Sequence, residues 1–203
     1  MQRKKIRHKA PFYALMIICG GYLLTWLIYS QWSTTISTHA LDLGVTLKQY
    51  SFIWTLNGLL IVLGQPLIKP IIKRLEHQLK AQMLIGIGIF IISFIVVGYA
   101  GSCKMFIISM AILTFGEMFV WPAIPTIANQ LAPKGREGFY QGIVNSAAPI
   151  GRMIGPLAGG ILVDLYGMHM MLIILTALTG LSIFTTIIYD RPIKKAEYKP
   201  ENP

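Results

Sequence analysis

The stretch MLIGIGIFIISFIVVGYA, residues 83–100, contains no charged residue and decides the class of fold. About twenty predominantly apolar residues are what a helix needs to cross a hydrocarbon core of roughly 30 Å. The whole chain agrees, because 54% of its 203 residues are hydrophobic and only 13% are charged, whereas a soluble domain carries about 25% charged residues. The sequence therefore predicts an integral membrane protein. Its spanning parts must be helices, since lipid offers the backbone no hydrogen-bond partners.

Further apolar stretches of similar length lie on either side of this one. The predicted spans cover residues 12–33, 52–71, 83–100, 105–127, 140–162 and 170–189. They predict an all-α bundle of six transmembrane helices over residues 12–189, between a basic N-terminus (1–11) and a polar tail (190–203). The first stretch lacks an A-x-A-like cleavage site, so we expect a retained helix and not a signal peptide.

The 18 Lys and Arg residues are concentrated in alternate segments between the spans. The N-terminus, the segments after the second and fourth spans, and the tail carry nearly all of them. The positive-inside rule therefore predicts a multi-pass protein of the cell membrane with both termini in the cytoplasm. The same topology accounts for the net charge of +10 without a nucleic-acid partner, and makes the lipid bilayer the expected environment.

Two oppositely charged residues lie near the middle of predicted spans, where an unpaired charge costs at least about 2.5 kcal/mol. Glu117 lies in the fourth span, and Arg152 lies at matching depth in the fifth. Because consecutive spans are antiparallel, the two side chains are placed to form an ion pair, and an unpaired Glu117 would act as a proton carrier. A fixed structural pair is the alternative interpretation, and direct contact of Arg152 with an anionic substrate is a third.

The fifth span separates a polar face from a face of small residues. At 100° per residue, the polar stripe contains Gln141, Asn145 and Arg152, which indicates a face that lines a cavity. The other face carries a glycine at every fourth position, namely Gly151, Gly155 and Gly159. This spacing predicts close packing of a second helix, and Pro156 is expected to bend the span.

Polar and aromatic side chains also line one face of each of the first two spans. They are Tyr22, Trp26 and Tyr29 in the first span, where Gln31 adds further polarity, and Trp54, Asn57 and Gln65 in the second. Amphipathic aromatics combined with amides suit a cavity for a solute that is partly apolar and partly polar. Alternatively, the aromatics are interface or packing residues and the amides link neighbouring helices.

The sequence offers no signature of catalysis or of a bound cofactor. Its four histidines fall outside the predicted spans and share no ligand-like spacing, so we expect no metal site. Neither a protease signature nor a glycine-rich phosphate loop occurs, so we expect neither an enzyme nor a nucleotide-driven pump. A proton gradient is then the expected source of energy.

The glycines of the fifth span resemble a motif of a known family. Gly142, eight residues to Gly151, three more to Gly155-Pro156 and two more to Gly159-Gly160 reproduce the spacing G-x8-G-x3-GP-x2-GG. This is the antiporter motif of the drug:proton antiporter branch of the major facilitator superfamily. The run Asn57-Gly58-Leu59-Leu60 and the stretch from Gly116-Glu117 to Tyr140-x-Gly142 extend the resemblance over nearly the whole chain.

Members of this family usually have twelve spans in two six-span halves. The chain resembles the second half, because it lacks the loop G-x-L-x-D-R-x-G and the signature R-x-x-Q-G of the first. The resemblance implies that the first, second, fourth and fifth spans line a central cavity and that the third and sixth face lipid. It also implies a partner, either an N-terminal six-helix half or a second copy of the chain.

Residues and resemblance together predict a half-length transporter that exports small amphipathic molecules in exchange for protons. Glu117 would bind the proton, Arg152 would compete for it, and the aromatic and amide side chains would contact the solute. The alternative is an inactive or regulatory remnant of a split or truncated transporter gene, which acts only by association with other membrane proteins.

Overall fold

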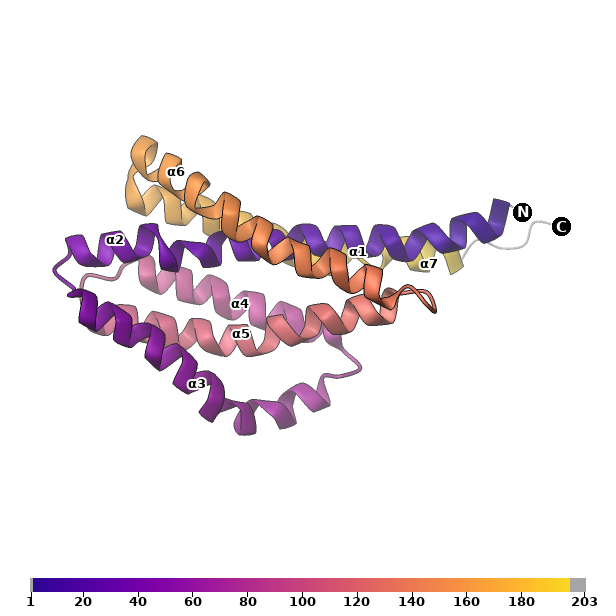
Figure 1. Cartoon of the computed structure of the whole chain (residues 1–203), viewed down its shortest axis with the longest axis horizontal. Coiled ribbons are helices and arrows are strands. Elements are labelled where there is room, and N and C mark those ends of the chain that lie inside the picture. Colours follow the sequence, from indigo (N-terminus) through magenta and orange to yellow (C-terminus); the bar gives the residue numbers. More distant parts are fainter. Residues whose placement is uncertain (1, 198–203) are drawn as a thin grey trace.

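The computed structural model of the chain describes residues 2–197, with side chains from residue 9 to residue 194. Every regular element in that part is helical. The elements are α1 (Gln2–Tyr29), the 3-10 turn η1 (Ser30–Ser33), α2 (Thr35–Asp42), α3 (Leu47–Arg74), α4 (Leu79–Gly98), α5 (Cys103–Leu131), α6 (Glu137–Ile188) and α7 (Arg191–Glu197). The long helices run along the long axis of the molecule, and α7 lies at the end where α1 begins (Figure 1).

Helix α6 contains two membrane-crossing segments. It has 52 residues, far more than the roughly 20 that one crossing needs. At Gly167 the backbone adopts φ 79° and ψ 166°, which glycine tolerates without strain, and the chain folds back on itself (Figure 1). Among the described residues, five helices are long and apolar enough to cross a membrane, and Gly167 divides the last of them into two segments that are each long enough to cross. The predicted all-α transmembrane bundle is confirmed, with six passes.

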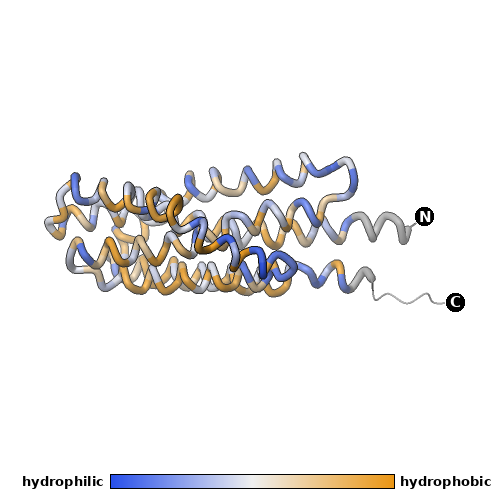
Figure 2. The backbone as a smooth tube through the Cα atoms, turned by 90° about the horizontal axis from the view of Figure 1, so that it is seen from below, coloured by the Kyte–Doolittle hydropathy of each residue, from blue (hydrophilic) through white to orange (hydrophobic). Residues whose placement is uncertain are grey.

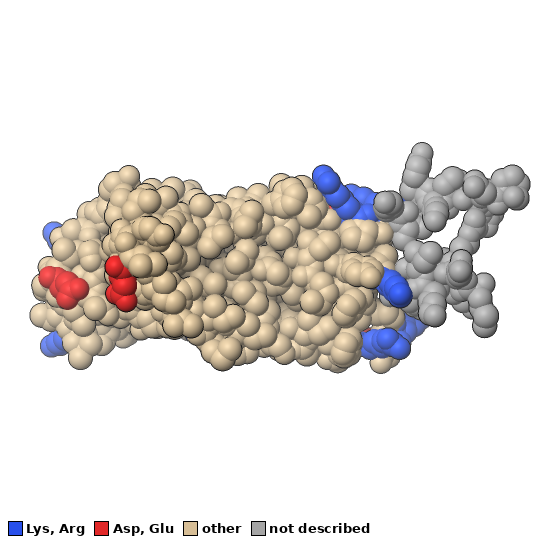
Figure 3. All heavy atoms as spheres, turned by 90° about the horizontal axis from the view of Figure 1, so that it is seen from above, with Lys and Arg blue, Asp and Glu red and all other residues tan. Residues whose placement is uncertain are grey.

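Charged residues are separated from the apolar middle of the molecule. Apolar residues dominate the central part of the tube in Figure 2, and the face in Figure 3 shows Lys, Arg, Asp and Glu only towards its two ends. An uncharged band between charged ends is the surface expected of a protein surrounded by lipid. Together with the five candidate membrane helices, it makes the chain a multi-pass membrane protein.

Most of the long helices extend beyond the predicted spans, because bilayer thickness limits the apolar stretch and not the helix. α1 begins at Gln2, within the stretch 1–11 predicted as a separate N-terminal segment. α2 was not expected, since its sequence TISTHALD has no apolar run, and it packs through Ile36 and Ala40. Of the predicted tail at 190–203, residues 191–197 form α7, and residues 198–203 lie outside the described part.

The glycine face of α6 lies directly against α1. A Cβ atom added to Gly151 would come within 2.6 Å of the Trp26 Cβ, and one added to Gly155 within 2.7 Å of the Leu27 carbonyl oxygen. Side-chain carbons do not approach other atoms so closely, so glycine is what permits the two helices to pack at this distance.

Polar side chains inside the bundle hydrogen-bond across helix pairs. The Ser109 hydroxyl of α5 donates to the Ser93 carbonyl of α4 at 2.8 Å, and the Ser93 hydroxyl donates to the Ser109 carbonyl at 2.7 Å. The Ser182 hydroxyl, which follows the turn at Gly167, donates to the Gly21 carbonyl of α1 at 2.7 Å. These bonds join α4 to α5 and the second part of α6 to α1.

Helix α3 is the least enclosed of the long helices. It packs mainly against α5, and its second half diverges from the bundle (Figure 1). Pro66 and Pro70 lie in this half, and each removes a backbone donor from the helix. Large apolar side chains on its outer face are exposed, among them Leu59, Val62, Leu63 and Leu67. The divergence leaves room for a cavity between α3 and α5.

The close approach at Gly155 predicts a difference between two glycine-to-alanine substitutions on α6. Gly155→Ala should destabilise the bundle by about 1–3 kcal/mol, because the new Cβ would meet the Leu27 carbonyl. Gly160→Ala is the matched control, since nothing lies within 4 Å of its added Cβ. Thermal unfolding of the purified chain in detergent, followed by tryptophan fluorescence, measures both. Equal unfolding midpoints would contradict the close contact.

Candidate functional site

A carboxylate lies buried in the middle of α5 and is held by a side chain of α3. Glu117 is only 3% exposed, and its Oε1 accepts a hydrogen bond from Asn57 Nδ2 at 3.0 Å. The same amide nitrogen donates to Thr114 Oγ1 at 2.9 Å, and the Thr114 hydroxyl donates to the Met110 carbonyl. Asn57 is itself buried, so this network fixes α3 against α5 in the interior of the bundle.

Aromatic side chains surround this carboxylate. Trp26 of α1 and Trp121 of α5 stack with their ring centroids 4.3 Å apart and their planes at 10°. Tyr29 meets both indoles edge-on, at 5.1 and 5.6 Å, and Trp54 lies 6.4 Å from Tyr29. Tyr29 and Trp121 both lie next to the Glu117 carboxylate. We call Tyr22, Trp26, Tyr29, Trp54 and Trp121 the aromatic cluster.

Arg152 contacts the aromatic cluster, and not the Glu117 carboxylate. Its guanidinium carbon lies 4.0 Å from the centroid of the Trp26 ring, within the range of a cation–π contact. Within residues 9–194, no ion pair of 4.0 Å or less joins Arg152 to Glu117 or to another carboxylate. The direct pair that the sequence suggested is therefore not formed in this structure, although both charged side chains adjoin one cluster.

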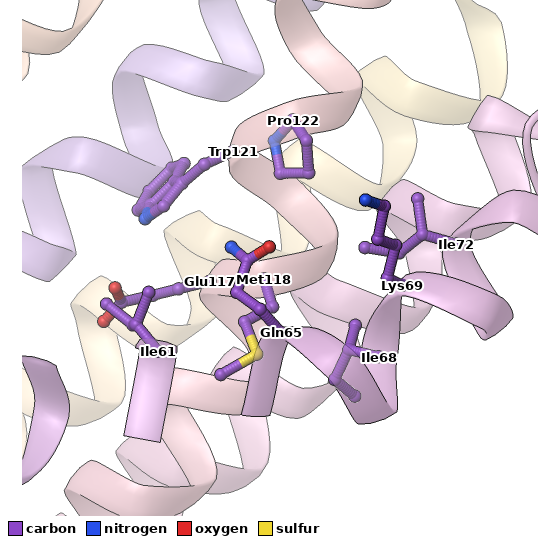
Figure 4. Close-up of a pocket in the computed structure, with 9 residues that line it drawn as sticks. All are labelled: Ile61, Gln65, Ile68, Lys69, Ile72, Glu117, Met118, Trp121 and Pro122. Carbon is purple, nitrogen blue, oxygen red and sulfur yellow. The ribbon is translucent and has the colours of Figure 1, made fainter. Parts of the chain in front are cut away.

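A cavity of about 420 Å³ lies between α3 and α5 (Figure 4). It is lined by Ile61, Gln65, Ile68, Lys69 and Ile72 from α3 and by Glu117, Met118, Trp121 and Pro122 from α5. Its volume falls within the roughly 300–1,000 Å³ of small-molecule sites. Figure 4 shows the Lys69 amino group directed into the space between the two helices. The cavity thus combines an apolar wall with one acidic and one basic side chain.

The structure brings most of the predicted site residues together. Tyr22, Trp26, Tyr29 and Trp54 join the aromatic cluster, Asn57 holds Glu117, Arg152 stacks on Trp26, and Gln65 lies in the cavity wall. They come from α1, α3, α5 and the first part of α6. These are the helices of the first, second, fourth and fifth predicted spans.

The remaining predicted residues lie elsewhere. Gln31 donates from Nε2 to the Gly155 carbonyl at 2.8 Å, so its amide links η1, directly after α1, to α6. Gln141 donates from Nε2 to the Pro125 carbonyl at 2.7 Å and links α6 to α5. Asn145 is exposed on α6. The other glycines of the motif differ in their surroundings. A Cβ atom added to Gly142 or Gly160 would have no neighbour within 4 Å, whereas one added to Gly159 would meet the Gln31 amide. Pro156 is half-buried beside Gly155.

Among the aromatic and charged residues of the site, sequence reasoning missed Trp121 and Lys69. Trp121 follows Glu117 by four residues, so helical periodicity places both on one face of α5, and this signal was available. Lys69 falls within the predicted second span, residues 52–71, but was not predicted to belong to the site. It lies in α3, which continues to Arg74 through Pro66 and Pro70. Nothing in the apolar pattern indicates that a lysine beside two prolines faces a cavity.

A protein-family model described as Major Facilitator Superfamily matches residues 10–203. The match includes all six passes of the bundle. The family is one of membrane transporters, which supports the prediction that the chain is not an enzyme.

Individual relatives agree with this match. The chain is 57% identical over 192 residues to the MFS-type transporter YttB of Bacillus subtilis (strain 168), a match that covers 95% of the chain and 48% of YttB. It is 26% identical over 193 residues to the multidrug resistance protein MdtG of Escherichia coli O1:K1, covering 90% of the chain and 46% of MdtG. The chain thus spans about half the length of the curated relatives it matches.

Among solved structures, the POT family transporter PepTSo resembles this one with a TM-score of 0.69 at 22% sequence identity. The similarity covers 95% of the chain and 43% of PepTSo. At this level of identity the comparison shows the fold alone. The bundle therefore has the fold of a little less than half of that transporter chain.

The bond between Asn57 and Glu117 predicts thermodynamic coupling between two helices. Asn57→Ala should destabilise the bundle by about 1–3 kcal/mol, because it leaves a buried carboxyl without its donor. In a Glu117→Ala background the same substitution should cost less, with a coupling of about 0.5–3 kcal/mol. Unfolding midpoints of the four proteins measure the coupling, and Asn145→Ala, at an exposed position, is the control. Additive effects would contradict the bond.

Proposed function

Because the chain belongs to the major facilitator superfamily of transporters, we propose that it exports small amphipathic molecules in exchange for protons, by alternating access. The observation that carries this proposal is the position of Glu117. Its carboxylate is buried in the bundle and at the same time forms part of the cavity wall. Ionisable side chains within membrane spans usually mark a substrate or proton pathway.

In this proposal Glu117 binds and releases the coupling proton. In its ionised form it accepts the hydrogen bond from Asn57, and in its protonated form it removes one negative charge from the cavity wall. Solute and proton then bind in the same space, so the occupancy of one changes the affinity for the other. Asn57 acts as the residue that positions the carboxyl, and Thr114 holds Asn57 in place.

The lining of the cavity supports an amphipathic solute. Ile61, Ile68 and Ile72 offer apolar surface, while Gln65 and the face of Trp121 offer polar and aromatic contacts. Pockets of this composition bind molecules with a large apolar body and few polar groups. The name of the relative MdtG, a multidrug resistance protein, points to the same class of solute.

We further propose that the bundle works against a partner six-helix half and is itself the second half. Transport sites of this architecture lie where two repeats meet, so each repeat must present a face to the other. α3 and the first part of α6 carry large exposed apolar side chains, such as Leu63 and Leu67 on one and Met153 and Leu157 on the other. These two helices flank the aromatic cluster, so a partner packed on both would close the site.

The distribution of charge supports termini that face the cytoplasm. In Figure 3 most of the visible Lys and Arg atoms lie near the end that holds the start of α1, while the opposite end shows the Asp and Glu atoms together with fewer basic ones. By the positive-inside rule the basic end is cytoplasmic. The cavity lies beside the half of α3 that reaches towards this end.

A chimera tests the proposal, with this chain replacing the segment of YttB that it matches. In cells depleted of other efflux pumps, the chimera should export fluorescent amphipaths at a rate that depends on the proton gradient. Glu117→Gln should abolish this pH dependence while leaving membrane insertion intact. Glu137→Gln, an exposed carboxylate that accepts only the Gly135 backbone N–H, is the matched control. Unchanged pH dependence in Glu117→Gln would rule out the proton role.

A further inference from the structure

We propose that the cavity between α3 and α5 binds an amphipathic organic anion, whose charged group contacts Lys69 and whose apolar body lies along the isoleucines and Trp121. This inference names the solute class of the transport proposed above and rests on that function. The sign of the ligand's charge is inferred from the charged side chains in and around the cavity that a ligand can reach.

In this cavity the carboxylate of Glu117 is buried and hydrogen-bonded, whereas the amino group of Lys69 is open to a ligand. Glu117 is 3% exposed and accepts the hydrogen bond of Asn57, so little of its carboxylate is open to a ligand. Lys69 is exposed, and among residues 9–194 no carboxylate lies within 4.0 Å of its amino group. The amino group points into the cavity (Figure 4). The charged group of the cavity that is open to a ligand is therefore positive.

Arg152 adds a second positive charge near the cavity, beyond the stacked rings of Trp26 and Trp121. Its guanidinium already covers the outer face of Trp26, which is stacked on Trp121. A cation in the cavity is repelled by the positive charges of both Lys69 and Arg152, whereas an anion is attracted by both.

The remaining wall explains why the anion must be amphipathic. Ile61, Ile68, Ile72 and Met118 provide apolar surface, and Gln65 is the uncharged polar side chain among the lining residues. A small inorganic anion would leave this surface unused and open to water. An anion with an apolar or aromatic body of up to about 420 Å³ fills the cavity and removes the surface from water.

Two ions of the same shape and opposite charge test the proposal, namely tetraphenylborate and tetraphenylphosphonium. Binding to the purified full chain in phosphatidylcholine nanodiscs is followed by tryptophan fluorescence, with partition into empty nanodiscs subtracted. Tetraphenylborate should bind more tightly. Lys69→Gln should weaken it about fivefold, the size expected for one ion contact, and should leave tetraphenylphosphonium unchanged or tighter. Lys69→Arg keeps the charge and should keep the affinity.

Lys73→Gln is the matched control, since Lys73 is exposed on the same end of α3 and is not among the lining residues. Glu117→Gln removes the negative charge and should tighten tetraphenylborate. Preference for the phosphonium ion, absence of tetraphenylborate binding, or equal losses in Lys69→Gln and Lys73→Gln would overturn the proposal. Competition by added phosphatidylglycerol would assign the same anion site to a lipid headgroup, and its absence to a soluble solute.

These experiments test the anion site and the transport function independently, so one hypothesis can be wrong while the other holds. A charge preference in the isolated chain that depends on Lys69 establishes the anion site even if the YttB chimera exports nothing. Export by the chimera, combined with a preference for the phosphonium ion, would keep the transport function and overturn the solute class.

Discussion

Polar groups inside this bundle must find their partners in other helices, because lipid supplies none. Asn57 reaches from α3 to α5, Ser93 and Ser109 join α4 to α5, and Gln31 joins η1 to α6. Each bond satisfies a buried group and at the same time determines which helices are neighbours. The glycine face of α6 adds close backbone contact where no side chain intervenes. The position of the cavity follows, since α3 is held to α5 through Asn57 and diverges from it further along.

The two charged residues predicted to pair, Arg152 and Glu117, each contact an uncharged side chain in this structure. Arg152 rests on Trp26, in a contact worth about 0.5–2 kcal/mol, and Glu117 is held by Asn57. The alternating access proposed above requires two packings of similar free energy, and contacts of this size can be exchanged between them.

The membrane-spanning helices and the buried carboxylate could be predicted, because the sequence patterns that indicate them each lie within a single segment. Apolar stretches of about twenty residues predicted all six passes, and a carboxylate in the fourth span predicted a buried charge. What could not be predicted depends on the meeting of distant segments. Arg152 turned to an indole of α1, a choice that no helical periodicity contains. Lys69 faces a cavity only because α3 stays helical through two prolines and diverges from α5.

The parallel stack of Trp26 and Trp121 has an optical consequence. Two indoles whose centroids are 4.3 Å apart share their electronic excitation, so their near-ultraviolet circular dichroism is that of a coupled pair and not of two independent chromophores. The two rings belong to α1 and α5, and any movement of one helix against the other changes their separation and angle. The protein therefore carries its own spectroscopic reporter of helix movement, placed at the site where a solute would bind and requiring no label.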